Sequence, residues 1–281
     1  MKTKYSIFLI FMIFIFASCE DIIDIELNTL DPQIVIEGDV IVGQKISVKI
    51  SQTADYYDPI DFPPISTAIV TVDDGEGNSE ILKQTDTLGL YKSENMIGEE
   101  GKKYNLKIEY NGEEFTSESL TPDGVEDWMS IFSSMEIEIG DTIIEALAFL
   151  IFFDDTEPSV PNYYRLRAYN INDPNKGKGT FEIFDDTEKD GDGVVTIVKA
   201  PVDYKEFDTI VAEVWTINQQ TYNFYNTLSD IAGSPGGGGP PPTSTPANPS
   251  SNITNNAYGY FSSYTVSIDT LIVFKMPFKK D

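Results

Sequence analysis

Short runs in which apolar and polar residues alternate dominate the chain from residue 33 onward. Four of them, rich in β-branched residues or alternating with period two, are residues 33–38, 45–50, 67–72 and 104–110. Such runs predict strands that bury one face. Asn111 and Gly112 suit the two positive-φ positions of a tight hairpin turn, so we expect Phe115 to begin the returning strand. The pattern predicts an immunoglobulin-like β-sandwich over residues 31–121.

The second half of the chain continues the strand pattern with one interruption. Strand-like runs lie at residues 146–153, 163–170, 179–184, 194–199, 208–217, 259–263 and 264–274. Between residues 218 and 231 the apolar residues recur at three-residue steps, which predicts one helix that stops at Gly233. Glycine and proline at about 233–249 predict a loop. We therefore expect a second β-rich domain with one short helix over residues 125–281.

The first 18 residues have the pattern of an export signal rather than of a folded element. A short basic start precedes an eleven-residue, largely apolar run that is too short to span a bilayer. Small residues directly before Cys19 resemble a bacterial lipobox, although Phe16 stands where leucine is usual. The sequence predicts a lipoprotein signal peptide over residues 1–18, lipidation of Cys19 and a tether over residues 19–30. The alternative is a signal peptide with an unmodified cysteine near its end.

Composition restricts the chemistry that this architecture can perform. The chain has 46 acidic and 19 basic residues, a net charge of −27, no histidine and one cysteine. This charge opposes binding to nucleic-acid phosphates, and the absence of histidine excludes histidine-dependent catalysis. A single cysteine excludes intramolecular disulfides and cysteine-rich metal sites. We therefore predict a protein that is not an enzyme and that binds no nucleic acid.

The densest acidic cluster, residues 185–193, is a candidate calcium site. Oxygen ligands at alternate positions could surround the cation; they are Asp186, Glu188, Asp190 and Asp192. The cluster is not an EF-hand, because Ile197 stands where the loop needs a bidentate glutamate. The alternative is a solvated hairpin loop between strands at residues 181–184 and 194–198. Calcium is the one cofactor that the sequence suggests.

Aromatic residues outside the expected core are candidates for ligand or partner contact. Tyr56 and Tyr57 lie in a proline-rich loop, and Trp128 follows the expected domain boundary. Ring faces bind the flat apolar faces of sugars and peptides. Trp215 lies in an alternating strand, which indicates a core position instead.

Four stretches of the chain carry a family resemblance that covers nearly all of the sequence after Cys19. They are residues 34–38; residues 68–75 with 89–91 and 101–108; residues 163–166; and residues 222–225 with 249–261. Together they resemble a DUF4249-like family of Bacteroidota outer-membrane lipoproteins of unknown function, whose genes typically neighbour TonB-dependent receptors. Asn256 stands where the family usually has glycine, and asparagine is the next best residue at positive φ.

The resemblance implies a lipid-anchored, surface-facing accessory or binding protein that works with a TonB-dependent receptor in nutrient uptake. Acidic residues soon after Cys19 resemble the surface-export signals of such lipoproteins. The ligand is open, with a glycan or a peptide as candidates. One alternative is a stand-alone glycan-binding or adhesive surface lipoprotein. A hydrolase that uses two neighbouring carboxylates is a more distant alternative.

Overall fold

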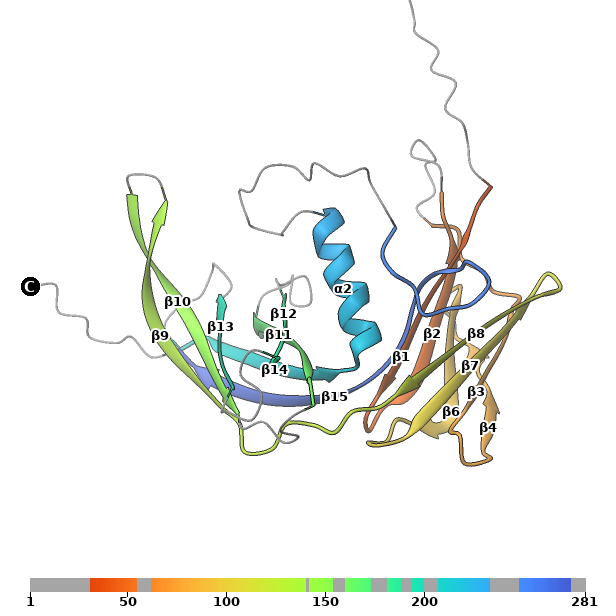
Figure 1. Ribbon diagram of the computed structural model, residues 1–281, viewed down its shortest axis with the longest axis horizontal. Helices are drawn as coiled ribbons and strands as arrows, with labels where there is room; N and C mark the ends of the chain where they lie inside the picture. Colours follow the sequence, from red (N-terminus) through yellow and green to blue (C-terminus); the bar gives the residue numbers. More distant parts are fainter. Residues whose placement is uncertain are drawn as a thin grey trace, which may run out of the picture. The chain divides into compact units, whose positions relative to one another are not determined.

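Strands account for nearly all of the regular structure, as the alternating sequence pattern predicts. The computed structural model describes residues 31–54, 62–139, 142–153, 160–172, 181–187, 194–199, 207–232 and 248–273. Figure 1 shows three sheets and one helix in this part of the chain. The fold is therefore mainly β, with a β-sandwich and a second β-rich part that contains one short helix.

The strands before residue 121 form the sandwich. One side contains β1 (Ile34–Ile41), β2 (Lys45–Gln52), β6 (Leu90–Ile97) and β5 (Lys83–Gln84), and the other contains β4 (Ser79–Ile81), β3 (Ile69–Asp73), β7 (Lys103–Tyr110) and β8 (Glu113–Leu120). Alternate residues of both sides meet in one hydrophobic core, in which Ile36, Ile50, Val72 and Ile108 are fully buried. This arrangement confirms the predicted immunoglobulin-like sandwich.

The tight hairpin between β7 and β8 is confirmed. Asn111 and Gly112 have φ angles of 52° and 82°. Positive φ at both central residues matches the right-handed twist of the flanking strands. The predicted turn therefore fixes the register of the two strands, which pair from Tyr110 with Glu113 onward.

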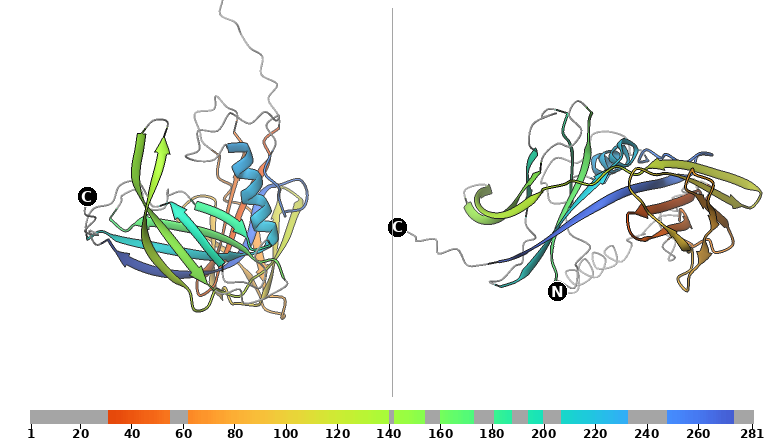
Figure 2. Two further views of the ribbon diagram at one scale, coloured as in Figure 1. Left: turned by 60° about the vertical axis from the view of Figure 1, so that its left-hand side comes forward. Right: turned by 90° about the horizontal axis from the view of Figure 1, so that it is seen from below.

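One eight-stranded sheet joins the sandwich to the rest of the chain. Its further strands are β12 (Phe181–Asp185), β11 (Tyr163–Asn170), β14 (Thr209–Ile217) and β15 (Tyr258–Ile272), and a separate three-stranded sheet contains β13 (Val194–Lys199), β10 (Thr142–Phe153) and β9 (Met129–Ile139). Strand β15 pairs with β1 in parallel along its first half and with β14 in antiparallel fashion along its second half (Figure 2). The large sheet therefore contains strands from both sides of the expected domain boundary at residues 122–124.

A second hydrophobic core lies between β10 and the large sheet. Every second residue of β11 is buried there, among them Tyr164 and Leu166, and they pack with Ile151 and Phe153 of β10. The alternation of a strand places the residues between them on the opposite face. That second face of β11, β14 and β15 carries the candidate site described below.

The hairpin predicted between residues 181–184 and 194–198 is wrong. Strand β12 pairs with β11 in the large sheet, whereas β13 pairs with β10 in the three-stranded sheet. Both runs have strand patterns and lie close in sequence, which resembles a hairpin. The two strands instead extend different sheets: β12 adds to β11 at the edge of the large sheet, and β13 adds to β10 at the edge of the three-stranded sheet.

The predicted helix is confirmed as α2 (Gln219–Ala232), which lies against β11, β12 and β15 on the face opposite the second core. Asn218 caps its N-terminus, since the Asn218 Oδ1 accepts a hydrogen bond from the Thr221 backbone N–H at 2.9 Å. The Thr221 hydroxyl also donates to Ser262 of β15 at 2.7 Å. Among the residues described, no helix is long and apolar enough to span a membrane.

The parallel pairing of β1 with β15 depends on a glycine that has no space for a side chain. Gly259 has a φ of 98°, and a Cβ on it would lie 2.0 Å from the Ile36 carbonyl oxygen. Asn255 and Asn256, in the turn just before it, have φ angles of 59° and 56°, so the expectation of positive φ at Asn256 is confirmed. The turn and the glycine together bring the start of β15 against β1.

Candidate functional site

Both arginines of the chain lie on one face of β11. Arg165 and Arg167 alternate with buried core residues, so both side chains leave the sheet on the face that α2 partly covers. In the register of the sheet Arg165 is opposite Trp215, and Arg167 is opposite Glu213. We call this surface the arginine face and define it by Arg165, Arg167, Glu213, Trp215, Tyr225 and Tyr264.

Three aromatic rings surround the guanidinium of Arg165. Its central carbon lies 4.5 Å from the ring centre of Trp215, 4.7 Å from that of Phe181 and 4.8 Å from that of Tyr225. Its Nη1 donates to the Tyr225 hydroxyl at 3.2 Å, whereas its buried Nε has no acceptor among the described residues. Cation–π contacts hold this cation in place, and most of its donor capacity is unused within the described part of the chain.

Arg167 lies beside a carboxylate without a close hydrogen bond to it. The Arg167 Nη1 is 3.8 Å from the Glu213 Oε2, which is too long for a hydrogen bond. Both Glu213 oxygens accept hydrogen bonds from neutral donors, the Tyr169 hydroxyl at 3.1 Å and the Trp215 Nε1 at 2.9 Å. Each Glu213 oxygen therefore accepts one hydrogen bond from a neutral donor, and the Arg167 guanidinium approaches the carboxylate only to 3.8 Å.

A second carboxylate, Asp39 of β1, lies near the arginine face among tyrosines. It accepts a hydrogen bond from the Tyr264 hydroxyl at 2.9 Å, and Tyr264 stacks on Trp215 with ring centres 4.7 Å apart. Burial raises the pKa of Asp39, and the Tyr264 hydrogen bond opposes that rise. Burial also raises the pKa of the Tyr260 and Tyr264 hydroxyls far above the usual range. The tyrosines therefore remain neutral donors at neutral pH.

Substituting Asp39 tests this electrostatic arrangement. Because the pKa of Asp39 is raised in the folded state, its contribution to stability is largest at low pH and falls as pH rises above 3.8. Asp39→Asn keeps an acceptor for the Tyr264 hydroxyl but cannot ionise. We expect the free energy of unfolding of the wild type, relative to this variant, to fall as the pH rises above 3.8 in urea denaturation. Asp123→Asn, at an exposed position, is the control. The free energy of unfolding of the wild type relative to this control should change little with pH. The same pH dependence for both variants would contradict a special role of Asp39.

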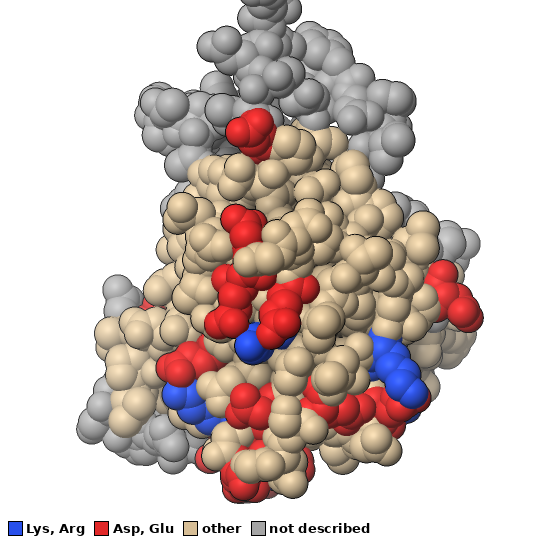
Figure 3. Space-filling view, turned by 90° about the vertical axis from the view of Figure 1, so that its right-hand side faces the viewer, with Lys and Arg blue, Asp and Glu red and all other residues tan. Residues whose placement is uncertain are grey.

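The lysines of the sandwich, unlike the arginines, lie close to carboxylates. Lys102 is 3.1 Å from Glu99 and 3.2 Å from Glu76, and Lys107 is 2.7 Å from Glu109. Figure 3 shows lysines set among acidic side chains on this side of the molecule. Solvent-exposed pairs of this kind add little stability, but they bring carboxylates within 4 Å of Lys49, Lys83, Lys102, Lys103 and Lys107.

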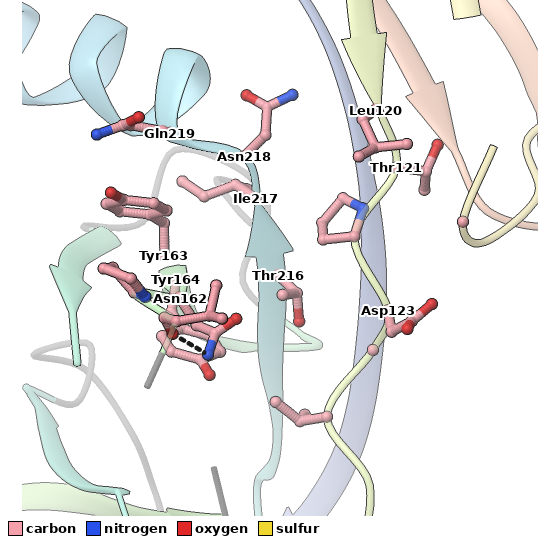
Figure 4. Close-up of a pocket in the computed structure, with 16 residues that line it drawn as sticks. Leu120, Thr121, Asp123, Asn162, Tyr163, Tyr164, Thr216, Ile217, Asn218 and Gln219 are labelled. Carbon is pink, nitrogen blue, oxygen red and sulfur yellow. Dashed lines mark hydrogen bonds between the residues drawn. The ribbon is translucent and has the colours of Figure 1, made fainter. Parts of the chain in front are cut away.

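A cavity of about 310 Å³ lies beside the end of β14 (Figure 4). The segment after β8, the loop before β11 and the start of α2 line it, and Asp123 is the one charged residue in its lining. The hydroxyls of Thr121 and Thr216 line it and have no hydrogen-bond partner among the described residues. Its volume equals that of about ten water molecules in the liquid and lies at the lower end of the range of small-molecule pockets. It lacks the charged and stacked groups that distinguish the arginine face.

The structure describes one of the four proposed calcium ligands. Asp186 is 3% exposed, and its Oδ1 accepts the backbone N–H of Asn162 at 2.7 Å. Glu188, Asp190 and Asp192 lie outside the described residues. Within the described ranges no three acidic, histidine or cysteine side chains gather in a geometry that could hold a metal ion. The calcium site stays a prediction.

The aromatic predictions have mixed outcomes. Trp128 is half-buried and packs against the second hydrophobic core, beside Val125. Tyr56 and Tyr57, like Cys19, lie outside the described residues. The prediction of a core position for Trp215 is wrong, because Val214 takes the core side of β14 and Trp215 faces the other way.

Sequence reasoning did not single out the arginines, although the sequence contains a signal for them. A chain with 46 acidic residues places its two arginines two positions apart in one strand, after two tyrosines. Two of the four stretches that carry the family resemblance also converge here: residues 163–166 supply Arg165, and residues 222–225 with 249–261 supply Tyr225 and Tyr260. The last two rings lie 6.0 Å apart.

Comparisons with known proteins identify a family and one solved structure that aligns weakly. A family model described as "Domain of unknown function (DUF4249)" matches residues 20–269. No curated protein matches the chain. The crystal structure of the chicken CNTN1 FN1-FN3 domains aligns over 87% of this chain and 67% of that chain, at 12% sequence identity and a TM-score of 0.27.

Proposed function

Since this chain belongs to the DUF4249 family, whose description assigns no activity, we propose a function from its residues and geometry. In this proposal the protein is a non-enzymatic binding lipoprotein of the outer membrane of Bacteroidota. It is anchored through Cys19, faces the cell surface, and works with a TonB-dependent receptor in nutrient uptake.

The arginine face is the observation that supports a binding role. Arginine, tryptophan and tyrosine are the residues that contribute most to binding surfaces, and here they gather on one face of β11, β14 and β15. Both nearby carboxylates, Asp39 and Glu213, accept hydrogen bonds from neutral donors. That occupation favours a surface that holds a ligand over one that transfers protons to it.

An anchor at Cys19 would supply the mechanism by which the protein helps a receptor. Several acyl chains on one residue give stable membrane attachment, because each buried CH₂ adds about 0.8 kcal/mol. An anchored binding face raises the local concentration of its ligand beside the receptor without strong contacts between the two proteins. The proposal therefore needs only weak affinity between lipoprotein and receptor.

A stand-alone glycan-binding lipoprotein is the second candidate. The observation that favours it is the gathering of aromatic rings at the arginine face, where the half-buried Trp215 stacks on the buried Tyr264 with 25° between the ring planes. This candidate differs from the first in having no receptor partner.

Crosslinked purification from native membranes separates the two candidates. The tagged full chain is expressed in its host, crosslinked, purified and analysed by mass spectrometry, with Cys19→Ala as the control. We expect a TonB-dependent receptor to copurify with the wild type and not with the control. Recovery of no receptor, together with binding of the purified chain to a glycan array, would overturn the first candidate and support the second.

A further inference from the structure

We propose that the arginine face recognises a ligand through a carboxylate group, which Arg165 and Arg167 bind. This inference rests on the proposed binding function and names the class of ligand for the same face. Guanidinium groups present planar pairs of N–H donors that match a carboxylate in geometry and charge.

The two arginines lie farther from carboxylates than the paired lysines of the sandwich do. Lys102 and Lys107 of the sandwich each lie within 3.2 Å of at least two carboxylate oxygens. Within the described ranges Arg167 has its nearest carboxylate at 3.8 Å, and Arg165 has none within ion-pair distance, although the buried Asp39 interacts with it electrostatically. A half-buried cation without a close anion is poorly compensated for its lost hydration. A bound carboxylate would compensate both arginines.

The two carboxylates near the arginine face accept hydrogen bonds from neutral side chains. Glu213 accepts from Tyr169 and Trp215, and Asp39 accepts from Tyr264. These hydrogen bonds hold the acids in place as fixed groups of the site. The buried Nε atoms of both arginines have no acceptor among the described residues.

The surroundings of the two arginines favour a ligand of low negative charge with an apolar or ring-shaped body. Asp39 and Glu213 repel any anion that approaches, and this cost grows with the charge of the ligand. A carboxylate with one charge therefore fits better than a phosphate with two. Beside the cations lie the ring of Tyr169, 4.7 Å from Arg167, and the side chain of Ile268, which is 60% exposed. These surfaces suit an apolar or ring-shaped body that carries the carboxylate.

Two sources could supply such a carboxylate: an acidic sugar such as a uronate, or the C-terminus of a peptide. The shared chemistry is tested by calorimetry on the full chain in detergent with four probes. Galacturonate, which carries one carboxylate, is compared with neutral galactose, and trialanine is compared with its C-terminal amide. We expect at least one acidic probe to bind about tenfold more tightly than its neutral partner, and the identity of that probe distinguishes the two sources.

Matched variants assign the binding to the arginines. Arg167→Lys keeps the charge and removes the planar donor pair. We expect this variant to bind the acidic probe at least about tenfold more weakly than the wild type. Its side chain is 16% exposed and lies at the loosely neutralised edge of the face. Arg165→Lys is the second variant, since Arg165 packs between rings. The control is Lys83→Gln, which removes an exposed cation on β5 of the sandwich. Thermal unfolding of each variant shows that it is folded.

Three results would overturn the carboxylate proposal. They are equal binding of acidic and neutral probes, unchanged binding in folded Arg167→Lys and Arg165→Lys variants, or no binding of any probe to the wild type. The proposed function fails separately, because its test is copurification of a receptor. Recovery of the receptor with no acidic-probe binding would retain the binding lipoprotein and reject its carboxylate ligand.

Discussion

Replacing Gly259 by alanine is expected to lower the free energy of unfolding by at least about 3 kcal/mol, near the upper end of single-residue effects. The alanine Cβ would lie 2.0 Å from the Ile36 carbonyl oxygen and 2.8 Å from its carbonyl carbon. Both atoms belong to the backbone of β1 and cannot move aside as a flexible side chain would. The strain falls where β1 and β15 first pair, with Ile36 opposite Gly259.

Gly43→Ala is the matched control for this substitution. Gly43 also has a positive φ, 77°, but nothing lies within 4 Å of the position that a Cβ would take. Its substitution should therefore cost only the left-handed backbone strain, about 1–2 kcal/mol. Urea denaturation of both variants measures the difference. Equal losses for the two variants would show that the contact between β1 and β15 does not limit stability.

Replacing Cys19 by alanine is expected to abolish lipid attachment and to remove the chain from the outer-membrane fraction. Cys19 is the one cysteine in the chain, and it follows the apolar run directly after two small residues. Without an acyl acceptor at this position the protein would lose the lipid anchor that we propose.

Labelling with radioactive palmitate and separation of the two membranes measure this effect. An unprocessed chain would keep its apolar leader, so the outer-membrane fraction is the relevant readout rather than total membrane. Ser18→Ala keeps a small residue before the cysteine and should leave labelling and location unchanged. Palmitate incorporation in Cys19→Ala, or its retention in the outer membrane, would contradict lipidation at this residue.

Local structure could be read from the sequence because its causes are local. The hairpin turn follows from Asn111 and Gly112, whose positive φ angles the turn requires. The helix follows from the three-residue steps after Asn218, which caps it. In each case the residues that determine the structure lie within one turn of the chain.

The path of the large sheet could not be predicted, because its decisive contacts join distant residues. Strand β15 pairs with β1 although Val35 and its partner Tyr258 lie far apart in the chain. Alternation shows that a strand buries one face but not which neighbour it pairs with. For the same reason β12 and β13 resembled a hairpin, and Trp215 resembled a core residue.

The arginine face shows the same limit for function. Arg165 and Trp215 become partners only through the register of β11 with β14, and Tyr225 reaches them from α2. Composition could have directed attention to the two arginines, since cations are rare in this acidic chain. It could not show that rings enclose one of them or that the nearest acids have other partners.

Site-specific photocrosslinking in native membranes tests most directly whether the arginine face is the binding surface. The probe p-benzoylphenylalanine replaces Ile268, which is 60% exposed and lies opposite Glu213 in the sheet. The control replaces Ile81, which is 63% exposed on β4 of the sandwich. We expect a crosslinked adduct from position 268 and none from position 81. An adduct from position 81 alone, or from neither position, would contradict the assignment of binding to this face.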